Sequence, residues 1–532
     1  MITIKSLTKV THHALKLTMA TGFLFCNSGI VNADTPPQTY SRAPMNAYNS
    51  QMDDALLGNK YEKPVWNLHD TLSLPDWLSM GIEQRTRFEN IDDTFKANTQ
   101  GGDQLIALQT DLWLQARFGQ FRAATEVMDS RGLGADIGPT FKTGKITHTN
   151  VGSGINNNSV DTADFVQAYV SWADKNAFSS NIGAEVKVGR QTMDLGSRRL
   201  IARPVYRNTV NSFTGVRIRL LDNANWTFNG FATLPVVRFP TTATAIISDT
   251  QQFDQEATRT WLSGGILEGY NLIDQVNTEI YLYNLDEGDS FNNPTRKRRY
   301  FTPGLRFYIK PAKGQFDFQA EGMGQFGTVR YTNTSSQDQQ HEAWSEHIEA
   351  GYTFDMAWSP RFMLEYDYAS GSKNPGLKSN TDSRFDPMYP ASDADFGPTG
   401  IYSAFSRSNI NSPGYKLNFT PRSNWTVTLQ QRLVWLASAS DCWGGTACTS
   451  TSNAVLFPTK TSGSFVGDQL GISSRYNFNS SLNFEAGWCR LFKGQFAKQG
   501  HSTLNTATGL GGGAVVPGTD TDYFFVQSQL RF

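Results

Sequence analysis

Arginine and carboxylate residues recur at every second position in many short stretches of this 532-residue chain. Between residues 82 and 89, Arg85 and Arg87 alternate with the less polar Thr86 and Phe88, and glutamates flank them. Guanidinium groups stay charged at ordinary pH and bind carboxylates through paired hydrogen bonds. Such rows could hold or pass an anionic solute, or could form fixed ion pairs with neighbouring carboxylates.

The elements that carry these rows are expected to be β-strands. Side chains of a strand point alternately to its two faces, so one face of each segment is charged and the other is apolar. From about residue 78 onward the pattern returns in segments of roughly ten residues separated by turn residues, as in a membrane barrel. A soluble β-sandwich also alternates, but the number of segments favours a barrel.

Three regions are expected along the chain. Residues 1–33 resemble an export signal, with Lys5, Lys9 and Lys16 before an apolar stretch and a small-residue cleavage site at 31–33. Residues 34–77 are rich in proline and lack alternation, and we interpret them as a periplasmic extension that either enters the lumen or stays mobile. Residues 78–532 are expected to form the outer-membrane β-barrel.

The predicted fold is all-β: a transmembrane antiparallel β-barrel of about 18 strands, which is within the range of such barrels. Short connections, such as 310–314, 358–360 and 420–424, are expected to be periplasmic turns. Long ones near 132–162, 191–212, 371–404, 440–466 and 496–520 are expected to be extracellular loops. Barrels of sixteen to eighteen strands enclose an aqueous lumen.

The final segment places Phe524, Val526, Leu530 and Phe532 on one face. A terminal strand that ends in an aromatic residue resembles the strand recognised by the barrel assembly machinery, an expected partner. Tryptophans at segment ends are typical of interfacial girdles in contact with lipid and lipopolysaccharide. Those considered are Trp172, Trp226, Trp261, Trp358 and Trp425.

Composition excludes several classes of function. Hydrophobic residues make up 39% of the chain, which suits a barrel that is apolar only on its outside. Without residues 1–33 the net charge falls from −1 to −4, because three lysines and no acidic residue are lost, so no nucleic-acid partner is expected. No cofactor is expected either.

The cysteines suggest one loop disulfide. Cys442 and Cys448 lie in a stretch rich in glycine, threonine and serine, and an exported protein meets oxidising conditions. Metal binding by this pair is the alternative, but no histidine lies nearby. Cys489 is expected to be free, and His341 and His347 are interpreted as surface charge rather than a metal site, so the expected metal ligands are none.

Several sequence blocks resemble the alginate export family of outer-membrane porins. They are Leu74-Pro75-Asp76-Trp77-Leu78 before Arg85-Thr86-Arg87-Phe88-Glu89; Val188-Gly189-Arg190-Gln191 with Asp194, Gly196, Arg199 and Leu200; Asn211-Ser212-Phe213-Thr214-Gly215-Val216-Arg217; Ala369-Ser370-Gly371-Ser372-Lys373-Asn374-Pro375 with Phe385-Asp386-Pro387-Met388-Tyr389-Pro390; and Glu485-Ala486-Gly487-Trp488 with Phe492-Lys493-Gly494. Each block is weakly specific by itself, and their order over residues 74–532 carries the resemblance.

The resemblance implies an eighteen-stranded channel of the Gram-negative outer membrane, with an arginine-lined lumen that is gated by loops and passes an anionic uronic-acid polysaccharide. Of the expected lumen arginines, Arg190 belongs to the Gly-Arg-Gln block and is the strongest candidate. Its alternative is an ion pair with Glu185, Asp194 or another wall carboxylate. The expected pore-lining residues are Arg85, Arg87, Arg117, Arg190, Arg217, Arg219, Arg306, Arg432 and Arg475.

The stretch after Arg190 is a candidate constriction loop. Asp194, Arg198, Arg199 and Arg203, with Arg207, crowd this connection. If the loop folds inward, these residues form a selectivity ring. If it faces outward, they bind lipopolysaccharide phosphates. Strand periodicity says nothing about the direction of a loop, so both alternatives stay open.

Function is predicted to be the passive passage of a polar, anionic solute, by export of an alginate-like polysaccharide or by diffusion of organic acids. The alternative is a substrate-specific uptake porin for small, aromatic carboxylates. The polar faces also carry many carboxylates, so anion selectivity does not follow from composition. An outer-membrane barrel enzyme is the rival from another class; it is disfavoured because no Gly-x-Ser-x-Gly motif occurs and the histidines are scattered. A structural barrel or adhesin is a third class.

Overall fold

The computed structural model describes residues 56, 63–95, 102–135, 157–222, 225–273, 275–289, 294–376, 379–444, 457–500, 504–505, 510–511 and 518–532. The expected signal segment, most of the extension 34–77 and Cys448 lie outside these residues. Two compact units are distinguished, residues 1–36 and 37–532, and the second contains all the described elements. No helix in the described part of the chain is long and apolar enough to span a membrane.

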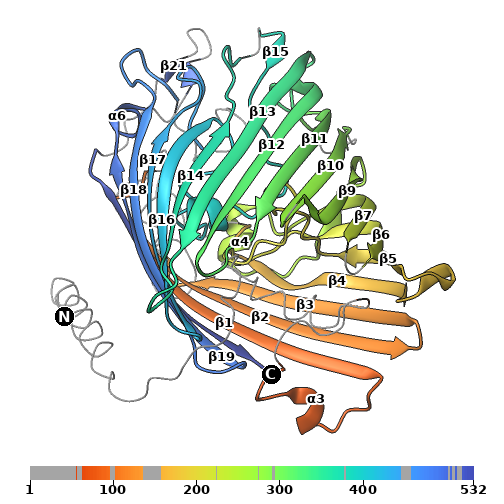
Figure 1. Cartoon of the computed structure of the whole chain (residues 1–532). Coiled ribbons are helices and arrows are strands. Elements are labelled where there is room, and N and C mark those ends of the chain that lie inside the picture. Colours follow the sequence, from red (N-terminus) through yellow and green to blue (C-terminus); the bar gives the residue numbers. More distant parts are fainter. Residues whose placement is uncertain are drawn as a thin grey trace. The chain divides into compact units, whose positions relative to one another are not determined.

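Eighteen long strands form a closed antiparallel barrel, as the alternation predicts (Figure 1). They are β1 (Leu78–Asp92), β2 (Asp103–Phe118), β3 (Phe121–Leu133), β4 (Asp161–Asp174), β5 (Gly183–Gln191), β6 (Phe213–Asp222), β7 (Trp226–Val237), β9 (Thr260–Ile273), β10 (Val276–Glu287), β11 (Arg299–Ile309), β12 (Gln315–Arg330), β13 (Asp338–Thr353), β14 (Arg361–Ala369), β16 (Ile410–Arg422), β17 (Trp425–Trp435), β18 (Phe465–Asn477), β19 (Leu482–Lys493) and β22 (Thr521–Arg531).

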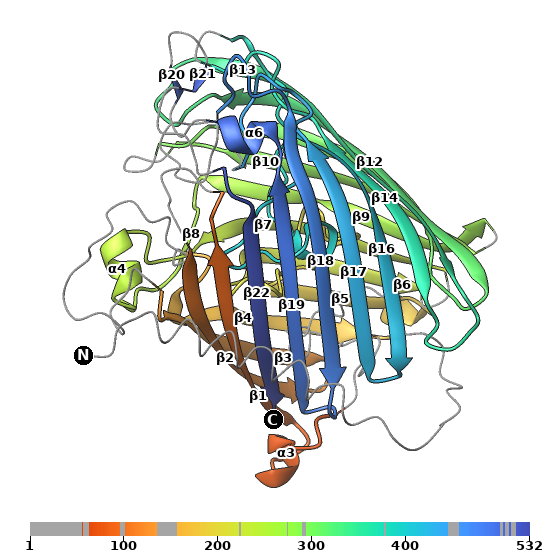
Figure 2. The same cartoon turned by 90° about the vertical axis from the view of Figure 1, so that its left-hand side faces the viewer.

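Short elements decorate the connections. The strands are β8 (Gln255–Glu256), β15 (Thr381–Asp382), β20 (Leu504–Asn505) and β21 (Leu510–Gly511), and the helices are α3 (Leu68–Thr71), η1 (Ala177–Ser179), α4 (Ala243–Ile247), α5 (Asp393–Phe396) and α6 (Gln495–Gln499). Long connections, including those with β15, β21 and α6, lie at the end of the barrel opposite the C-terminus, and we call this the extracellular end (Figures 1 and 2).

Closure comes from the last strand, which pairs with the first. β22 runs antiparallel to both β1 and β19, so the sheet has no free edge there (Figure 2). The backbone of Phe532 exchanges two hydrogen bonds with Ile82, at 2.9 and 3.2 Å. A closed sheet satisfies every strand's backbone groups, which a hydrocarbon environment requires.

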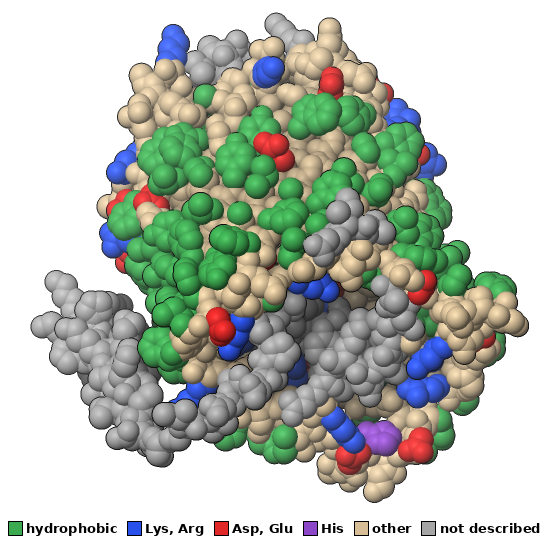
Figure 3. Space-filling model, viewed as in Figure 1, with side chains coloured by type: hydrophobic (Ala, Val, Ile, Leu, Met, Phe, Trp, Pro, Cys, Tyr) green, Lys and Arg blue, Asp and Glu red, His purple; other side chains and the backbone are tan. Residues whose placement is uncertain are grey.

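The two faces of the wall differ as the sequence predicts. On β1, Arg85 and Arg87 are buried on the inner face, whereas Phe88 is 40% exposed on the outer face. Apolar side chains gather on the outside (Figure 3), and on β13 and β14 they include Trp344, Ile348 and Leu364. The outside therefore provides the apolar band that a membrane barrel presents to lipid.

Part of the N-terminal extension contacts the periplasmic end of the barrel. α3 is followed directly by β1, and the ring of Trp66 stacks on Phe532 with centroids 6.3 Å apart. Farther upstream, Leu56 packs with Ala173 and Leu221 in a small buried cluster. These contacts fix both described pieces of the extension to the barrel.

Candidate functional site: a lumen crossed by two loops

The inner wall pairs several of its arginines with carboxylates on nearby strands. The closest contacts are Arg306–Glu279 at 2.6 Å, Arg475–Glu485 at 2.7 Å and Arg432–Glu365 at 2.8 Å, and Arg219–Glu185 is longer at 3.3 Å. Antiparallel register places three of these pairs directly opposite each other: Arg475 and Glu485, Arg306 and Glu279, and Arg219 and Glu185. Arg432 of β17 reaches Glu365 of β14 across the intervening strand β16. The mixed composition of the polar faces is therefore expressed as local ion pairs.

Arginines on the first strand and on β6 are also held in place. Arg87 forms an ion pair with Glu89 at 2.7 Å, and Arg85 donates to the carbonyl of Arg207 at 3.0 Å. On β6, Arg217 donates to the side-chain oxygen of Asn229 at 2.6 Å. These guanidiniums stiffen the wall and tie it to a loop.

Two of the expected arginines lie away from the middle of the lumen. Arg117 is exposed near the end of β2. Arg190 lies two residues after Val188 on β5, and Val188 is 46% exposed on the outer face. Because side chains alternate between faces, Arg190 does not continue the inner row of Glu185. It lies at the extracellular rim, where it pairs with Glu256 at 2.8 Å and lies 3.7 Å from Asp164.

The connection between β5 and β6, residues 192–212, folds into the lumen. Arg203 makes two hydrogen bonds to Glu126 of β3, at 2.7 and 2.9 Å. Four residues earlier, Arg199 contacts Glu321 of β12 at 2.7 Å. Since Glu126 and Glu321 are inner-face residues of well-separated strands, this inner loop, which we call loop A, lies across the lumen.

Further contacts press loop A against the wall. The hydroxyls of Tyr206 and Tyr523 lie 2.6 Å apart, and the Val205 carbonyl accepts a hydrogen bond from Arg85. A Cβ on Gly196 would meet the Glu279 carboxylate at 2.8 Å, and the φ of Gly196 is +52°, so glycine suits this close approach. Within the loop, Arg198 pairs with Asp194 at 2.7 Å.

A second inner loop, residues 370–409 between β14 and β16, was not assigned a lumen role from the sequence. In this loop B, Asp386 accepts hydrogen bonds from Arg298 at 2.8 Å and from Tyr300 of β11 at 2.9 Å. The backbone N–H of Ile401 donates to Glu89 of β1 at 2.7 Å. Loop B thus reaches from one part of the wall to another. The sequence signal for a position inside the lumen was a long connection that contains large apolar residues such as Phe385, which is fully buried.

The two loops contact each other inside the barrel. Ile201 and Tyr389 form a parallel β-bridge, and the backbone N–H of Tyr389 donates to Leu200 at 2.9 Å. Arg199 of loop A also binds the carboxylate of Asp395 in loop B through two hydrogen bonds of 3.0 Å. We call this contact the loop junction.

Charges continue from the loop junction into the wall. Asp395 pairs with Arg407 at 2.6 Å, Arg407 with Asp367 at 2.8 Å, and Asp367 with Arg432 at 2.8 Å. Burial alone would raise the pKa of Asp395, but Arg199 and Arg407 hold it well below its usual value. Burial would likewise lower the pKa of Arg199, whereas Asp395 and Glu321 raise it. Both loop groups therefore stay charged.

The histidine and cysteine predictions have different outcomes. His341 and His347 are buried on β13, 2% and 0% exposed, and His347 lies 2.8 Å from Asp367. Their interpretation as surface charge was wrong, because β13 extends farther toward the extracellular end than the sequence pattern indicated. Cys489 is free and buried. Cys442 is disulfide-bonded, and its expected partner lies outside the described residues.

Comparison with known proteins identifies the family. A model of the alginate export family matches residues 76–509, most of the chain. The chain belongs to the alginate export family. No protein with a curated description matches the sequence.

Solved structures with the same fold are distant in sequence. OccAB1 of Acinetobacter baumannii is 12% identical, with a TM-score of 0.50 over 86% of this chain and 97% of its own. OccD3 (OpdP) of Pseudomonas aeruginosa is 11% identical, with a TM-score of 0.50 over 86% and 91%. Family and fold together make this alginate export family protein an outer-membrane porin of Gram-negative cells, which indicates a channel rather than an enzyme.

Proposed function

We propose that this porin passes polar, anionic solutes passively, either as organic acids or as an alginate-like uronate polymer. The observation that carries the proposal is the concentration of guanidinium groups on the inner wall and on loop A. Arg219, Arg306 and Arg475 retain 14%, 14% and 19% side-chain exposure while paired with carboxylates. A partly exposed guanidinium can exchange a wall carboxylate for a passing one, which suits repeated weak binding and release.

The second candidate is selective uptake of small, aromatic carboxylates. It is supported by the contact between the two loops at Arg199 and Asp395, because loops that meet inside a barrel favour small solutes over a bulky polymer.

Residues at both ends of the chain keep their expected roles within the proposal. Residues 1–33 would direct export and be removed, and residues 34–77 would form a periplasmic extension before the barrel at 78–532. The outward side chains of β22, among them Val526 at 43% exposure, would be recognised by the barrel assembly machinery. As an outer-membrane porin, the protein contacts lipid and lipopolysaccharide.

Planar-bilayer recording tests the proposal. The refolded protein is compared with an Arg219→Gln/Arg306→Gln/Arg475→Gln variant, and the reversal potential is measured in a potassium chloride gradient. Preference for chloride that shifts toward potassium in the variant would support anion passage. Arg299→Gln is the matched control, because Arg299 pairs with Asp286 at an exposed position, with 48% and 57% side-chain exposure.

Added solutes separate the two candidates. Block of the current by an oligouronate supports passage of the polymer, and block by benzoate but not by the oligouronate supports uptake of small carboxylates. Cation preference in the unmodified protein, or a reversal potential that does not change in the triple variant, would contradict the anionic proposal. A chain that folds but conducts no current would contradict passage altogether.

A further inference from the structure

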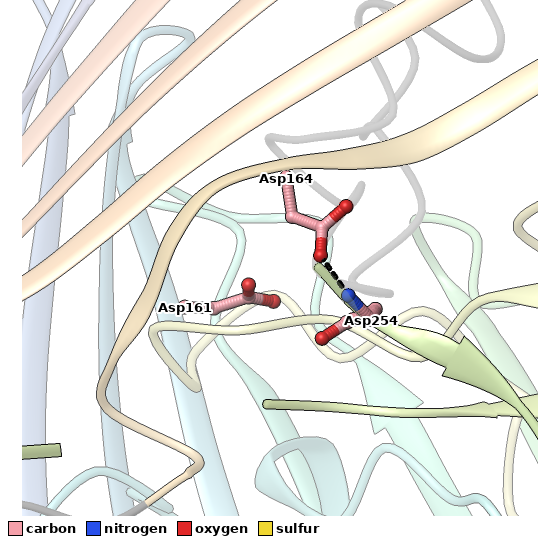
Figure 4. A group of neighbouring side chains, drawn as sticks. All are labelled: Asp161, Asp164 and Asp254. Carbon is pink, nitrogen blue, oxygen red and sulfur yellow. Dashed lines mark hydrogen bonds between the residues drawn. The ribbon is translucent and has the colours of Figure 1, made fainter. Parts of the chain in front are cut away.

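Three aspartates converge at the extracellular rim, away from the loop junction. Asp161 and Asp164 begin β4, and Asp254 comes just before β8 (Figure 4). One carboxylate oxygen from each residue lies within 4.8 Å of the others. Asp161 and Asp164 are each 2% exposed, so two of the three carboxylates are removed from bulk water. We call this group the aspartate cluster.

Backbone groups satisfy two members of the aspartate cluster and leave the third open. The backbone N–H groups of Phe165 and Asp254 donate to Asp164, and that of Phe239 donates to Asp254 at 2.7 Å. In contrast, Oδ1 of Asp161 is fully buried and has no hydrogen-bond partner among the residues that the structure describes. A buried carboxylate oxygen without a donor is costly, and the Asp161 side chain points toward the other two aspartates (Figure 4).

The nearby arginines do not neutralise the aspartate cluster through direct hydrogen bonds. Arg190 donates to Glu256 at 2.8 Å, whereas Asp164 is 3.7 Å away. Arg238 donates to neutral oxygens instead, including the Asn157 carbonyl at 3.0 Å and the Asn158 side chain at 2.9 Å. The oxygens of three carboxylates therefore meet at a point that these guanidiniums do not occupy.

Protonation of a carboxylate is the alternative to cation binding as a way to reduce the repulsion between the three carboxylates. Burial, together with the neighbouring Asp164 carboxylate, raises the pKa of Asp254 to about 7. The Phe239 backbone N–H opposes this rise, as do Arg238, which follows β7, and Arg190 of β5. Near neutral pH, a cation of suitable size would compete with a proton for this carboxylate.

We propose that Asp161, Asp164 and Asp254 bind a divalent cation, and that the cation is Ca²⁺. Calcium takes carboxylate and carbonyl oxygens at 2.3–2.6 Å, so two ligand oxygens on opposite sides of the ion are roughly 5 Å apart. The aspartate oxygens lie within 4.8 Å of one another, so one ion of this size can contact all three. Mg²⁺ prefers an octahedral shell at roughly 2.1 Å and keeps several of its waters, so a group of three protein carboxylates suits Ca²⁺ better.

Bound calcium would join two parts of the rim that are far apart in the sequence. It would hold the start of β4 against the segment that precedes β8. The backbone carbonyl of Asp254 also accepts a hydrogen bond from Arg190 at 3.2 Å. The ion would thus stiffen the rim beside β5, the strand from which loop A departs. The expectation of no metal site, drawn from sequence motifs alone, is the one this proposal replaces.

Equilibrium dialysis with radioactive Ca²⁺ tests the site, using full-length protein refolded in detergent without lipopolysaccharide. We expect one saturable site per chain, with a dissociation constant of about 10⁻⁴–10⁻³ M, as in extracellular modules. Asp161→Asn should weaken binding at least about tenfold, since one ligand charge is lost. Asp338→Asn is the matched control, because it removes an exposed carboxylate elsewhere at the extracellular end.

A second variant guards against misfolding. Asp254→Asn alters the less buried member of the aspartate cluster and should also weaken binding, while both variants keep the β-sheet circular dichroism of the parent protein. Unsaturable binding, or wild-type affinity in both folded variants, would overturn the site. Saturable binding with a preference for Mg²⁺ over Ca²⁺ would overturn the assignment of the ion.

Discussion

Loops A and B both enter the lumen, but they bring different charges to the wall. Loop A contributes guanidiniums, and its Arg199 and Arg203 bind the wall carboxylates Glu321 and Glu126. Loop B contributes both charges, because its Asp386 binds Arg298, which lies just before β11, and its Arg407 binds Asp367 of β14. Each loop is thus matched to a different sector of the barrel. Loops as well as wall strands therefore balance charge in this lumen.

The pairing of charges in the lumen affects the ion selectivity of the pore. Counting arginines along the strands would suggest a strongly anion-attracting pore, yet many of these arginines already hold a carboxylate. The field that a solute meets depends on which guanidiniums stay partly exposed after pairing, such as Arg475 at 19%. Desolvated ion pairs also fix geometry, since a partner left alone in a buried site is unfavourable.

The largest expected effect is the loss of the main wall contact of loop A. Arg203→Met leaves Glu126, which is fully buried, without its paired guanidinium. We expect destabilisation by about 3–5 kcal/mol, because an uncompensated buried charge remains. Thermal unfolding in detergent measures this loss, and conductance should rise as loop A leaves the lumen. The double variant Arg203→Met/Glu126→Gln should recover much of the stability, and a single variant as stable as the parent protein would contradict the assigned contact.

A smaller effect is expected at the loop junction. Arg199→Gln removes the hydrogen bonds to Asp395 and Glu321 while loop A keeps its Arg203 anchor. The cost should be about 1.5–3 kcal/mol, the range for hydrogen bonds to charged groups. Single-channel records should show larger and noisier currents. Asp395→Asn should act in the same direction, and if only one of the two variants changes the current, the loops are not coupled through this pair.

At an exposed wall pair the effect should be smaller again. Arg299→Gln breaks a 3.0 Å contact with Asp286 between side chains that are about half exposed. Solvent screens such pairs, so unfolding should change by less than about 1 kcal/mol and conductance should stay the same. Chemical denaturation and bilayer recording check both values. A loss of stability as large as that of Arg203→Met would show that this exposed pair contributes as much as the buried pairs of the lumen.

Mild acidification should have the smallest effect on the loop junction. The folded-state pKa of Asp395 is depressed, so the stability that its ion pairs contribute is present above its unfolded pKa of about 3.9 and is lost only as pH falls through the lower folded value. Conductance should therefore be constant between pH 8 and pH 5. Opening of the channel within that range would show that another titrating group controls the loops.

The alternation of polar and apolar residues was sufficient to predict most of the barrel. It predicted the start of the wall at Leu78, the strand number and the long loops, because each strand presents one lipid face and one polar face. It was also sufficient to contradict one expectation. Arg190 shares its parity with Val186 and Val188, so the period of two already placed it outside the inner row of Glu185.

The sequence by itself therefore determined the strands, their two faces and the closed sheet, since these depend on a local period and on the need to satisfy backbone groups in lipid. Only the tertiary structure decided the direction of the loops and the identity of each ion pair. Arg199 meets Asp395, 196 residues farther along the chain, and Asp161 meets Asp254, which follows strands β4 to β7 in the chain. No local pattern encodes such contacts, because they arise when the closed barrel brings distant segments into one enclosed space.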